Sequence, residues 1–319
     1  NLDDENKVIN KQILDELIIN KTKISIDNKF NIKNLLVNNY KKLIENNCKL
    51  ITKKNIYRFI CNFNNNLNLF ALTYSGKVIN IDWKKYLKSD YKLDSKLLNN
   101  INPYEILNFH NFNGNTDNYL CILCKDGRFK KILYDNEMLR TNRTFTVIKT
   151  KKENRIINSF LTEQNMLLII LTSIGRLFKY KLDNKYIAPV SKQAQGTILN
   201  KLFPREEIIS CCTCSTGDQI IIITKKGTCF SVKENEIYNS HDSKLGFIDG
   251  KIQIKNDMFI SVITDNKYCE IITNKERSAK INFSKLKINI NTKKFQIDFL
   301  DFENDEYINK IYFTKKLID

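Results

Sequence analysis

QIIIITKKGTCF, residues Gln219–Phe230, is the stretch that decides the fold. Four consecutive isoleucines bounded by polar residues predict a strand that is buried on both faces. Lys225-Lys226-Gly227 predicts a tight turn, because glycine adopts a positive φ without steric cost. Thr228-Cys229-Phe230 then begins a return strand, so the whole stretch predicts a β-hairpin.

The same hairpin pattern recurs along the chain. Phe70–Asp82, Leu120–Leu133 and Leu167–Tyr180 repeat it, and the turn glycines Gly76, Gly127, Gly175 and Gly227 are separated by 51, 48 and 52 residues. Tyr268–Phe283 is a weaker fifth copy, in which Glu276 replaces the glycine 49 residues on. Four of the nine glycines occupy this one point of the repeat, which argues against chance. A period near 50 residues centred on a hairpin predicts an all-β, propeller-like array of five to six four-stranded blades.

The bulk composition points to an anionic partner. The 319 residues carry a net charge of +17 with an ordinary apolar content of 42 %, and such a charge favours binding to a polyanion. Codon bias toward A and T would also enrich Lys and Asn, so part of the charge has a second explanation. No run of about 18 apolar residues occurs, so we expect no transmembrane helix and no membrane partner. The polar start NLDDENK also predicts no signal or transit peptide.

Nine cysteines are scattered through apolar runs. Their odd number and their positions predict reduced, buried thiols. Cys121-Ile-Leu-Cys124 has the C-x-x-C form but lies in a predicted strand, where residues three apart point to opposite faces. We therefore expect small hydrophobic residues here and no metal site.

No catalytic constellation emerges from the sequence. The two histidines, His110 and His241, are expected in loops, and neither has the neighbours of a triad or metal cluster. We expect no catalytic residue, no metal and no cofactor in this chain.

Basic residues recur at two points of the repeat. One set flanks the turn glycines, and the other lies in a polar loop marked by Gly196 and Gly246, which stand 21 and 19 residues past their turn glycines. In a closed array, equivalent positions lie around one rim, so these residues predict a basic belt that contacts phosphates without reading sequence. The candidate DNA-binding residues are Lys77, Lys125, Arg128, Lys130, Lys131, Arg140, Arg143, Arg176, Lys179, Lys192, Lys225, Lys226 and Lys244.

The two ends of the chain carry different patterns. Ile9, Ile13 and Leu17 form one narrow apolar stripe, which predicts that residues 1–22 are the end of a coiled-coil helix or a linker. We expect the β domain over residues 23–310 and a tail over 311–319. Asp298–Glu306 is acidic, and one hypothesis is that this segment competes with DNA for the rim.

The order of these motifs resembles the C-terminal domain of DNA gyrase A. The resemblance lies in the glycine hairpins and in Ser191–Phe230, where Ala194-Gln195-Gly196-Thr197 and Gly217-Asp218-Gln219 stand as in the cyanobacterial and plastid branch. It covers roughly residues 56–290. The basic-Thr-Ile strand at Lys21–Ile24 also resembles the family's entry into the domain.

The resemblance implies a β-pinwheel, in which each blade lends a strand to its neighbour and duplex DNA wraps around a basic rim. The chain would be a non-catalytic part of a type IIA topoisomerase, supporting negative supercoiling with the rest of gyrase A and with gyrase B in an A2B2 assembly. ATP and Mg²⁺ would act elsewhere in that enzyme, and the expected location is a plastid or apicoplast, or otherwise the cytoplasm with the nucleoid.

One departure from the family concerns wrapping. The family's first blade carries a box of the form Q-R-R-G-G-R-G, and no such segment occurs here. A topoisomerase IV-type pinwheel that binds DNA without strong wrapping therefore stays open. A protein-interaction propeller, whose charge would reflect codon bias, is the other alternative.

Overall fold

The computed structural model describes fifteen stretches of the chain: residues 23–27, 31–35, 51–52, 57–62, 68–81, 91–92, 98–112, 119–134, 144–162, 166–242, 245–249, 252–265, 267–283, 294–296 and 301–315. Within them the protein is all-β, and its only helices are single 3-10 turns: η2 (Pro103–Glu105), η3 (Lys152–Asn154) and η4 (Glu234–Glu236). No helix in these stretches is long and apolar enough to cross a membrane. The predicted N-terminal helix and the linker over residues 1–22 lie outside the described residues.

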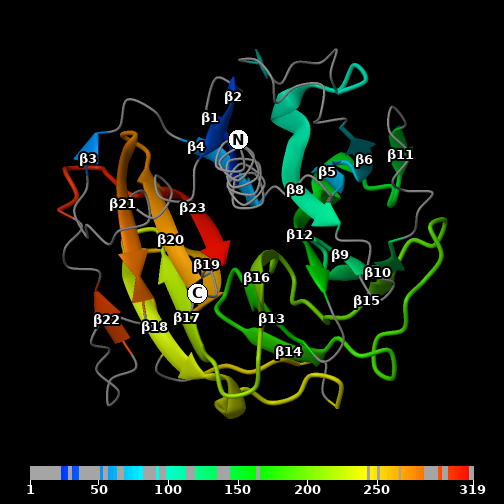
Figure 1. Cartoon of the computed structure of the whole chain (residues 1–319). Helices are drawn as coiled ribbons and strands as arrows, with labels where there is room; N and C mark the ends of the chain where they lie inside the picture. The colour runs from blue at the N-terminus through cyan, green and yellow to red at the C-terminus, as the bar shows by residue number, and fades with distance from the viewer. Residues whose placement is uncertain are drawn as a thin grey trace, which may run out of the picture.

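The described strands form six small antiparallel sheets, here called blades 1 to 6 in the order of their hairpins along the chain, which surround a common centre (Figure 1). Each contains one hairpin. The hairpins are β1 (Lys23–Asp27) with β2 (Asn31–Leu35), β5 (Asn68–Thr73) with β6 (Lys77–Asn80), β9 (Tyr119–Cys124) with β10 (Arg128–Leu133), β13 (Leu167–Thr172) with β14 (Leu177–Lys181), β17 (Gln219–Thr224) with β18 (Thr228–Lys233), and β20 (Lys267–Thr273) with β21 (Arg277–Asn282).

A third strand follows each hairpin and pairs with its first strand. In chain order these inner strands are β4 (Tyr57–Asn62), β8 (Ile106–Phe112), β12 (Ile156–Thr162), β16 (Ile208–Cys214), β19 (Phe259–Thr264) and β23 (Ile308–Lys315). From β4 to β19 each lies against the next. They line the inside of the array, and His110 falls in β8, so the expectation of a loop there was wrong.

In blades 1, 2, 3 and 5 the outermost strand comes from further along the chain. These exchanged strands are β7 (Tyr91–Lys92), β11 (Thr144–Thr146), β15 (Thr197–Ile198) and β22 (Lys294–Gln296), and they reach their blades after the next hairpin has formed. Among the described residues, blade 4 has two isolated bridges at this place, Leu177 to Phe247 and Lys179 to Asn239. In blade 6 the outer strand is β3 (Ile51–Thr52), from the beginning of the chain, so the two ends of the array meet in one sheet.

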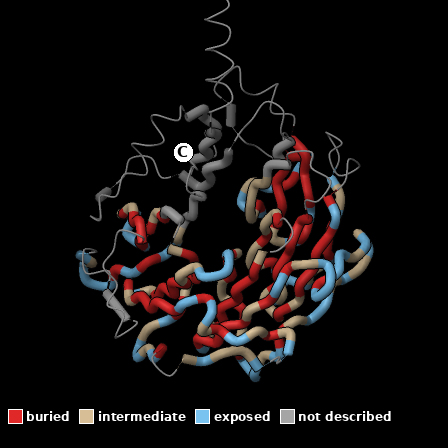
Figure 2. Tube along the Cα trace, turned by 60° about the horizontal axis from the view of Figure 1, so that its bottom comes forward, coloured by how far each residue is buried: buried red, intermediate tan, exposed pale blue. Residues whose placement is uncertain are grey.

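The apolar cores lie between blades. Ile220 and Ile222 of β17 pack with Ile169 and Leu171 toward blade 4, whereas Ile221 and Ile223 pack toward blade 6. Buried residues run along the strands and exposed residues collect at their ends (Figure 2). This confirms the strand buried on both faces that the four isoleucines predicted.

The cysteines follow the same rule. All seven whose side chains are described are buried and lie in no disulfide, and burial raises the pKa of Cys124 to about 12. Cys121 and Cys124 enter different cores, on opposite faces of β9. The two cysteines of the C-x-x-C pair therefore act as small hydrophobic core residues, as their position in a strand predicted.

Candidate nucleic-acid interface

The five described hairpin turns, those of blades 2 to 6, are closed in the same way. Gly76, Gly127, Gly175 and Gly227 have φ between +83° and +86°, and Glu276 takes the same left-handed conformation at +58°. In four of these turns a threonine ends the first strand, and its hydroxyl accepts the N–H of the residue after the glycine position, as in Lys77 to Thr73 at 2.9 Å. In blade 3 this residue is Cys124, and Asp126 accepts the Arg128 N–H instead, at 2.9 Å. The Thr-x-x-[Gly/Glu]-x pattern was visible in the sequence but was not used there.

These turns form one continuous edge, which we call the turn arc. In the five hairpins whose turns are described, the first turn residue donates its N–H to the segment before its own inner strand, as Lys125 does to Arg155 and Lys225 to Met258. Its carbonyl accepts from the next inner strand, as Lys125 does from Ile208. Tyr74 makes both kinds of bond, to Glu105 and from Ile156, and the Lys225 carbonyl accepts from Ile308. Between blades 4 and 5 the contact is a packed one, because the Phe259 ring lies under Gly175. The arc thus runs from blade 2 to blade 6 and consists of the hairpin turns and the turns before β8, β12, β16, β19 and β23.

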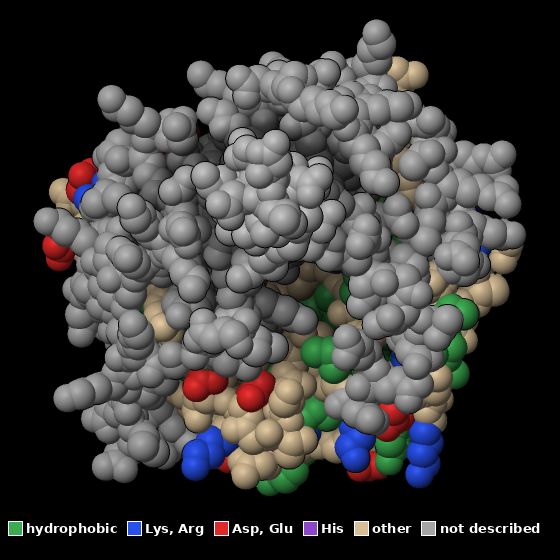
Figure 3. All heavy atoms as spheres, viewed as in Figure 1, with side chains coloured by type: hydrophobic (Ala, Val, Ile, Leu, Met, Phe, Trp, Pro, Cys, Tyr) green, Lys and Arg blue, Asp and Glu red, His purple; other side chains and the backbone are tan. Residues whose placement is uncertain are grey.

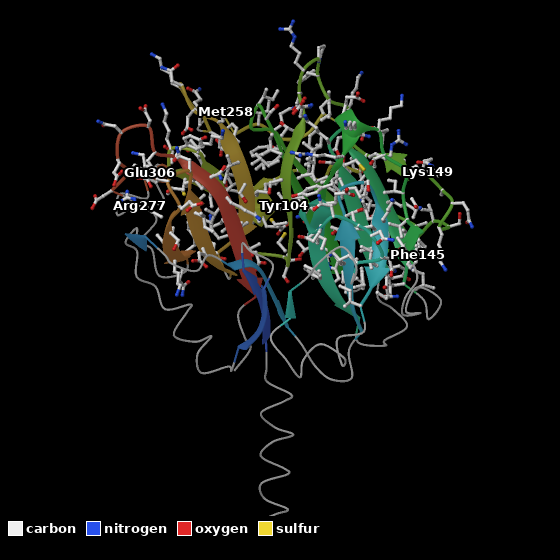
Figure 4. All side chains as sticks on the ribbon, turned by 90° about the horizontal axis from the view of Figure 1, so that it is seen from above. Tyr104, Phe145, Lys149, Met258, Arg277 and Glu306 are labelled. Atoms are coloured by element: carbon white, nitrogen blue, oxygen red, sulfur yellow. The ribbon has the colours of Figure 1, made fainter. Side chains whose placement is uncertain are left out.

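Cations are unevenly distributed along the turn arc. Blades 3 to 5 present the exposed or partly exposed residues Lys125, Arg128, Lys149, Lys151, Lys152, Arg155, Lys201, Arg205, Lys225, Lys226 and Lys255. Blade 6 presents Lys275 and Arg277 together with the exposed acids Glu276, Asp301, Glu303 and Asp305. Lys149 and the pair Arg277 and Glu306 lie at opposite sides of the array in Figure 4. The face drawn in Figure 3 carries Lys and Arg side chains beside Asp and Glu side chains along its lower border.

Four of the predicted DNA-binding residues are turned inward. Lys130 and Lys131 are 1 % and 2 % exposed. The Lys130 ammonium donates to the carbonyls of Val147 and Lys192, and that of Lys131 donates to Leu182, Ile187 and Asn184. Burial lowers the pKa of Lys130 to about 8. Both side chains satisfy carbonyls of irregular connecting segments, so neither is available to a phosphate.

Arg176 and Lys179 are held by carboxylates. The Arg176 guanidinium, 0 % exposed, makes a two-pronged ion pair with Glu206 and also donates to the carbonyls of Leu245 and Lys201. Lys179 Nζ lies 2.8 Å from Glu234 Oε1. Burial alone would raise the pKa values of Glu206 and Glu234, but hydrogen bonds from Arg176, Lys179 and backbone amides hold both below the usual range. These four residues are corrected from rim contacts to structural residues.

The remaining candidates divide into three groups. Lys77, Lys125, Arg128, Lys225 and Lys226 lie on the turn arc with some exposure, and Lys125 also pairs with Glu207 at 2.9 Å. Lys192 lies in the loop marked by Gly196, half-buried beside Lys130. Arg140, Arg143 and Lys244 lie outside the described residues.

Gly196 and Gly246, expected to mark a basic loop on the rim, have a different role. Gly196 and Gly246 have φ of +80° and +74°. A Cβ at Gly196 would lie 2.5 Å from the Phe129 carbonyl oxygen, and one at Gly246 would lie 2.9 Å from the Phe178 ring. Each glycine therefore lets an exchanged segment lie close to the second hairpin strand of the preceding blade, β10 for Gly196 and β14 for Gly246. These glycines thus serve strand exchange.

Sequence reasoning missed the basic residues before the inner strands. Lys151, Lys152, Arg155, Lys201, Arg205 and Lys255 all stand a few residues before the apolar residue that opens β12, β16 or β19. That spacing was the available signal. The acidic segment near the end also proved to be structural in part, because Glu303 and Glu306 pair with Lys275 and Arg277 in blade 6. Strand β23 runs to Lys315, beyond the expected domain end at residue 310.

Comparison with solved structures places this fold. The C-terminal domain of DNA topoisomerase IV aligns with a TM-score of 0.68 at 15 % identity, covering 92 % of this chain and 93 % of that one. The C-terminal domain of DNA gyrase A aligns with a TM-score of 0.66 at 16 % identity, covering 91 % and 98 %. No protein-family model matches the chain, and no curated protein matches it by sequence. The fold is the β-pinwheel of these two domains, as the resemblance implied.

Proposed function

We propose that this chain is the DNA-binding module of a type IIA topoisomerase and that duplex DNA follows the turn arc over blades 3 to 5. The observation that carries the proposal is the continuity of that arc. Turns far apart in the sequence are hydrogen-bonded into one edge, and that edge exposes lysines and arginines from three successive blades. Such cations bind phosphates independently of sequence and release condensed counterions, so binding depends steeply on salt.

The fold likeness supports the choice of a topoisomerase, and within that class we propose a gyrase-type role. The module would bend duplex DNA around its basic edge so that the rest of gyrase A and gyrase B can introduce negative supercoils. The ring gives this role a physical basis: smooth bending of DNA over 20–30 base pairs costs on the order of 1–6 kcal/mol, and cations on several blades can share that cost. A topoisomerase IV-type module that binds without strong wrapping is the second candidate, favoured by the missing Gly/Arg box.

The test of DNA binding compares two triple variants. Lys151, Lys152 and Arg155 lie on the turn arc of blade 3, whereas Lys181, Lys185 and Lys233 are exposed near the far ends of β14 and β18. Replacing the first three by Ala should weaken binding and reduce the slope of log K against log salt by about 3, since each phosphate contact contributes about 0.9. The second triple should leave the slope unchanged. Equal effects of the two triples, or no binding by the native chain, would contradict the proposal.

Wrapping is tested by sealing nicked circular DNA on the saturating protein. A gyrase-type module changes the linking number of the sealed circle, and a module that only binds leaves it unchanged. Binding with no change in linking number would therefore select the topoisomerase IV-type alternative.

A further inference from the structure

The hairpin turn of blade 4 differs from the others on the turn arc. The residue just before the left-handed position is Ser75, Asp126, Lys226 or Lys275 in four of the five described turns, and it is Ile174 in blade 4. Ile174 is 51 % exposed. The basic residue that follows the glycine is Arg176, which is buried. Blade 4 therefore presents an apolar tip where its neighbours present polar or charged ones.

Other exposed apolar side chains come from segments that contact the blade 4 hairpin. The Phe203 ring lies 4.2 Å from the Arg176 guanidinium carbon and is 48 % exposed. Leu245, whose carbonyl accepts a hydrogen bond from Arg176, is 59 % exposed. On the other side, Met258 is 58 % exposed and precedes Phe259, whose ring lies under Gly175. We call Ile174, Phe203, Leu245 and Met258 the apolar group; Met258 is labelled in Figure 4. The Arg176–Glu206 pair anchors the two segments that carry Phe203 and Leu245, through the Phe203 N–H and the Leu245 carbonyl.

Cations flank this apolar group on both sides of the arc. Lys201 and Arg205 are exposed on the turn that carries Phe203. Lys225 donates its N–H to the Met258 carbonyl, and Lys226 and Lys255 are exposed beside it. A polyanion that follows the arc from blade 3 to blade 5 would be held by cations before and after blade 4, and would press against apolar side chains between them.

We propose that the apolar group is a wedge that inserts at a base step of the bound duplex and opens it, so that the DNA kinks at blade 4. This inference rests on the proposed function, because it assigns a role to one part of the same edge. Apolar Phe, Leu, Ile and Met side chains insert between base steps and kink DNA, and pyrimidine–purine steps unstack most easily. A wedge therefore gives a module that otherwise binds only phosphates a preference for flexible steps, TA above all. The charge on both flanks favours DNA over a protein as the occupant.

The experiment uses the full chain and a duplex that carries 2-aminopurine at a central TA step and a fluorophore pair at its ends. The native chain should raise the 2-aminopurine fluorescence and bring the ends together. The double variant Ile174→Ser/Met258→Ser should lose the fluorescence rise and relax the bend, with its salt slope unchanged. Both replaced side chains are exposed, so folding should be little affected. Leu133→Ser is the matched control, because Leu133 is 45 % exposed at the far end of β10, away from the turn arc.

The outcomes separate the wedge from the proposed function. Unchanged fluorescence and end distance in the double variant, with DNA still bound, would overturn the wedge and leave the DNA-binding module intact. The wedge would also be overturned if the double variant lost binding to the rest of the enzyme while its DNA signals stayed native. Failure of the native chain to bind any duplex would overturn the proposed function itself.

Discussion

Arg128 in blade 3 and Arg176 in blade 4 occupy the same place in the repeat, directly after a turn glycine, yet they have opposite surroundings. The Arg128 side chain is 31 % exposed and lies 3.7 Å from Asp126 in its own turn. The Arg176 side chain is fully buried against Glu206. The difference comes from the segment before the inner strand: it supplies Glu206 in blade 4, whereas Asn154 stands in blade 3 and accepts the N–H of Asp126.

Blade 6 is an intermediate case. Arg277 pairs with Glu306, and their side chains are 18 % and 0 % exposed. Glu206 and Glu306 also accept the N–H of the residue three positions earlier, Phe203 and Glu303. An arginine at this place of the repeat is therefore a surface cation unless a carboxylate about 30 residues on draws it inward. Basic residues at the same place in the repeat therefore have two roles: some are surface cations, and others are buried partners of a carboxylate.

The largest effect should come from breaking the buried pair of blade 4. Glu206→Ala leaves the Arg176 guanidinium buried without a counter-charge, and such a loss costs about 3–5 kcal/mol of unfolding free energy. Chemical denaturation followed by circular dichroism measures it. Glu207→Ala is the control, since Glu207 is 47 % exposed in its pair with Lys125 and exposed pairs contribute about 0–1 kcal/mol. Equal losses in the two variants would contradict the distinction between buried and surface pairs.

A smaller effect, dependent on pH, should appear in blade 6. Burial alone would raise the pKa of Glu306, but hydrogen bonds from Arg277, Thr273 and the Glu303 amide lower it from 4.5 to about 2. Because the folded-state pKa lies below the unfolded one, this carboxylate stabilises the fold fully above about pH 5, and that contribution is lost as the pH falls toward 2.

The matching variant is Glu306→Gln. It should be less stable than the native chain at pH 6, by about 1.5–3 kcal/mol for a lost charged hydrogen bond, and the difference should shrink as the pH is lowered to 3. Denaturation midpoints at the two pH values measure this. If the stability difference between Glu306→Gln and the native chain grew on acidification, Arg277 would not be keeping the Glu306 carboxylate ionised in the folded state.

The smallest stability effect is expected for Arg128→Ala in blade 3. Its side chain is partly exposed, so the unfolding free energy should change by no more than about 0.5 kcal/mol. Removal of one phosphate contact should instead reduce the salt slope of DNA binding by about 1. A large loss of stability with an unchanged slope would place Arg128 with Arg176 among the structural arginines.

Much of the blade pattern could be read from local sequence. Ile220–Ile223 identified a strand buried on both faces, and Gly76, Gly127, Gly175 and Gly227 marked turns that need a left-handed residue. The first hairpin, β1 with β2, was missed because no glycine follows β1 and the residues after it are rich in Asn and Lys. Local patterns also could not distinguish Lys130, which binds buried carbonyls, from Lys125, which lies on the turn arc.

The sequence by itself determined the repeat, the hairpins, the buried strands and the excess of positive charge, because these depend on periodicity, glycine conformation and composition over short distances. Only the tertiary structure decided which cations face solvent and where the array closes. The fold of blade 4 brings Arg176 and Glu206 into contact, 30 positions apart, and strand exchange brings together Phe129 and Gly196, 67 positions apart. It also pairs Arg277 of the last hairpin with Thr52 from the beginning of the chain. Contacts at such separations leave no trace in any single window of sequence, so the candidate binding edge emerged only when the blades were assembled.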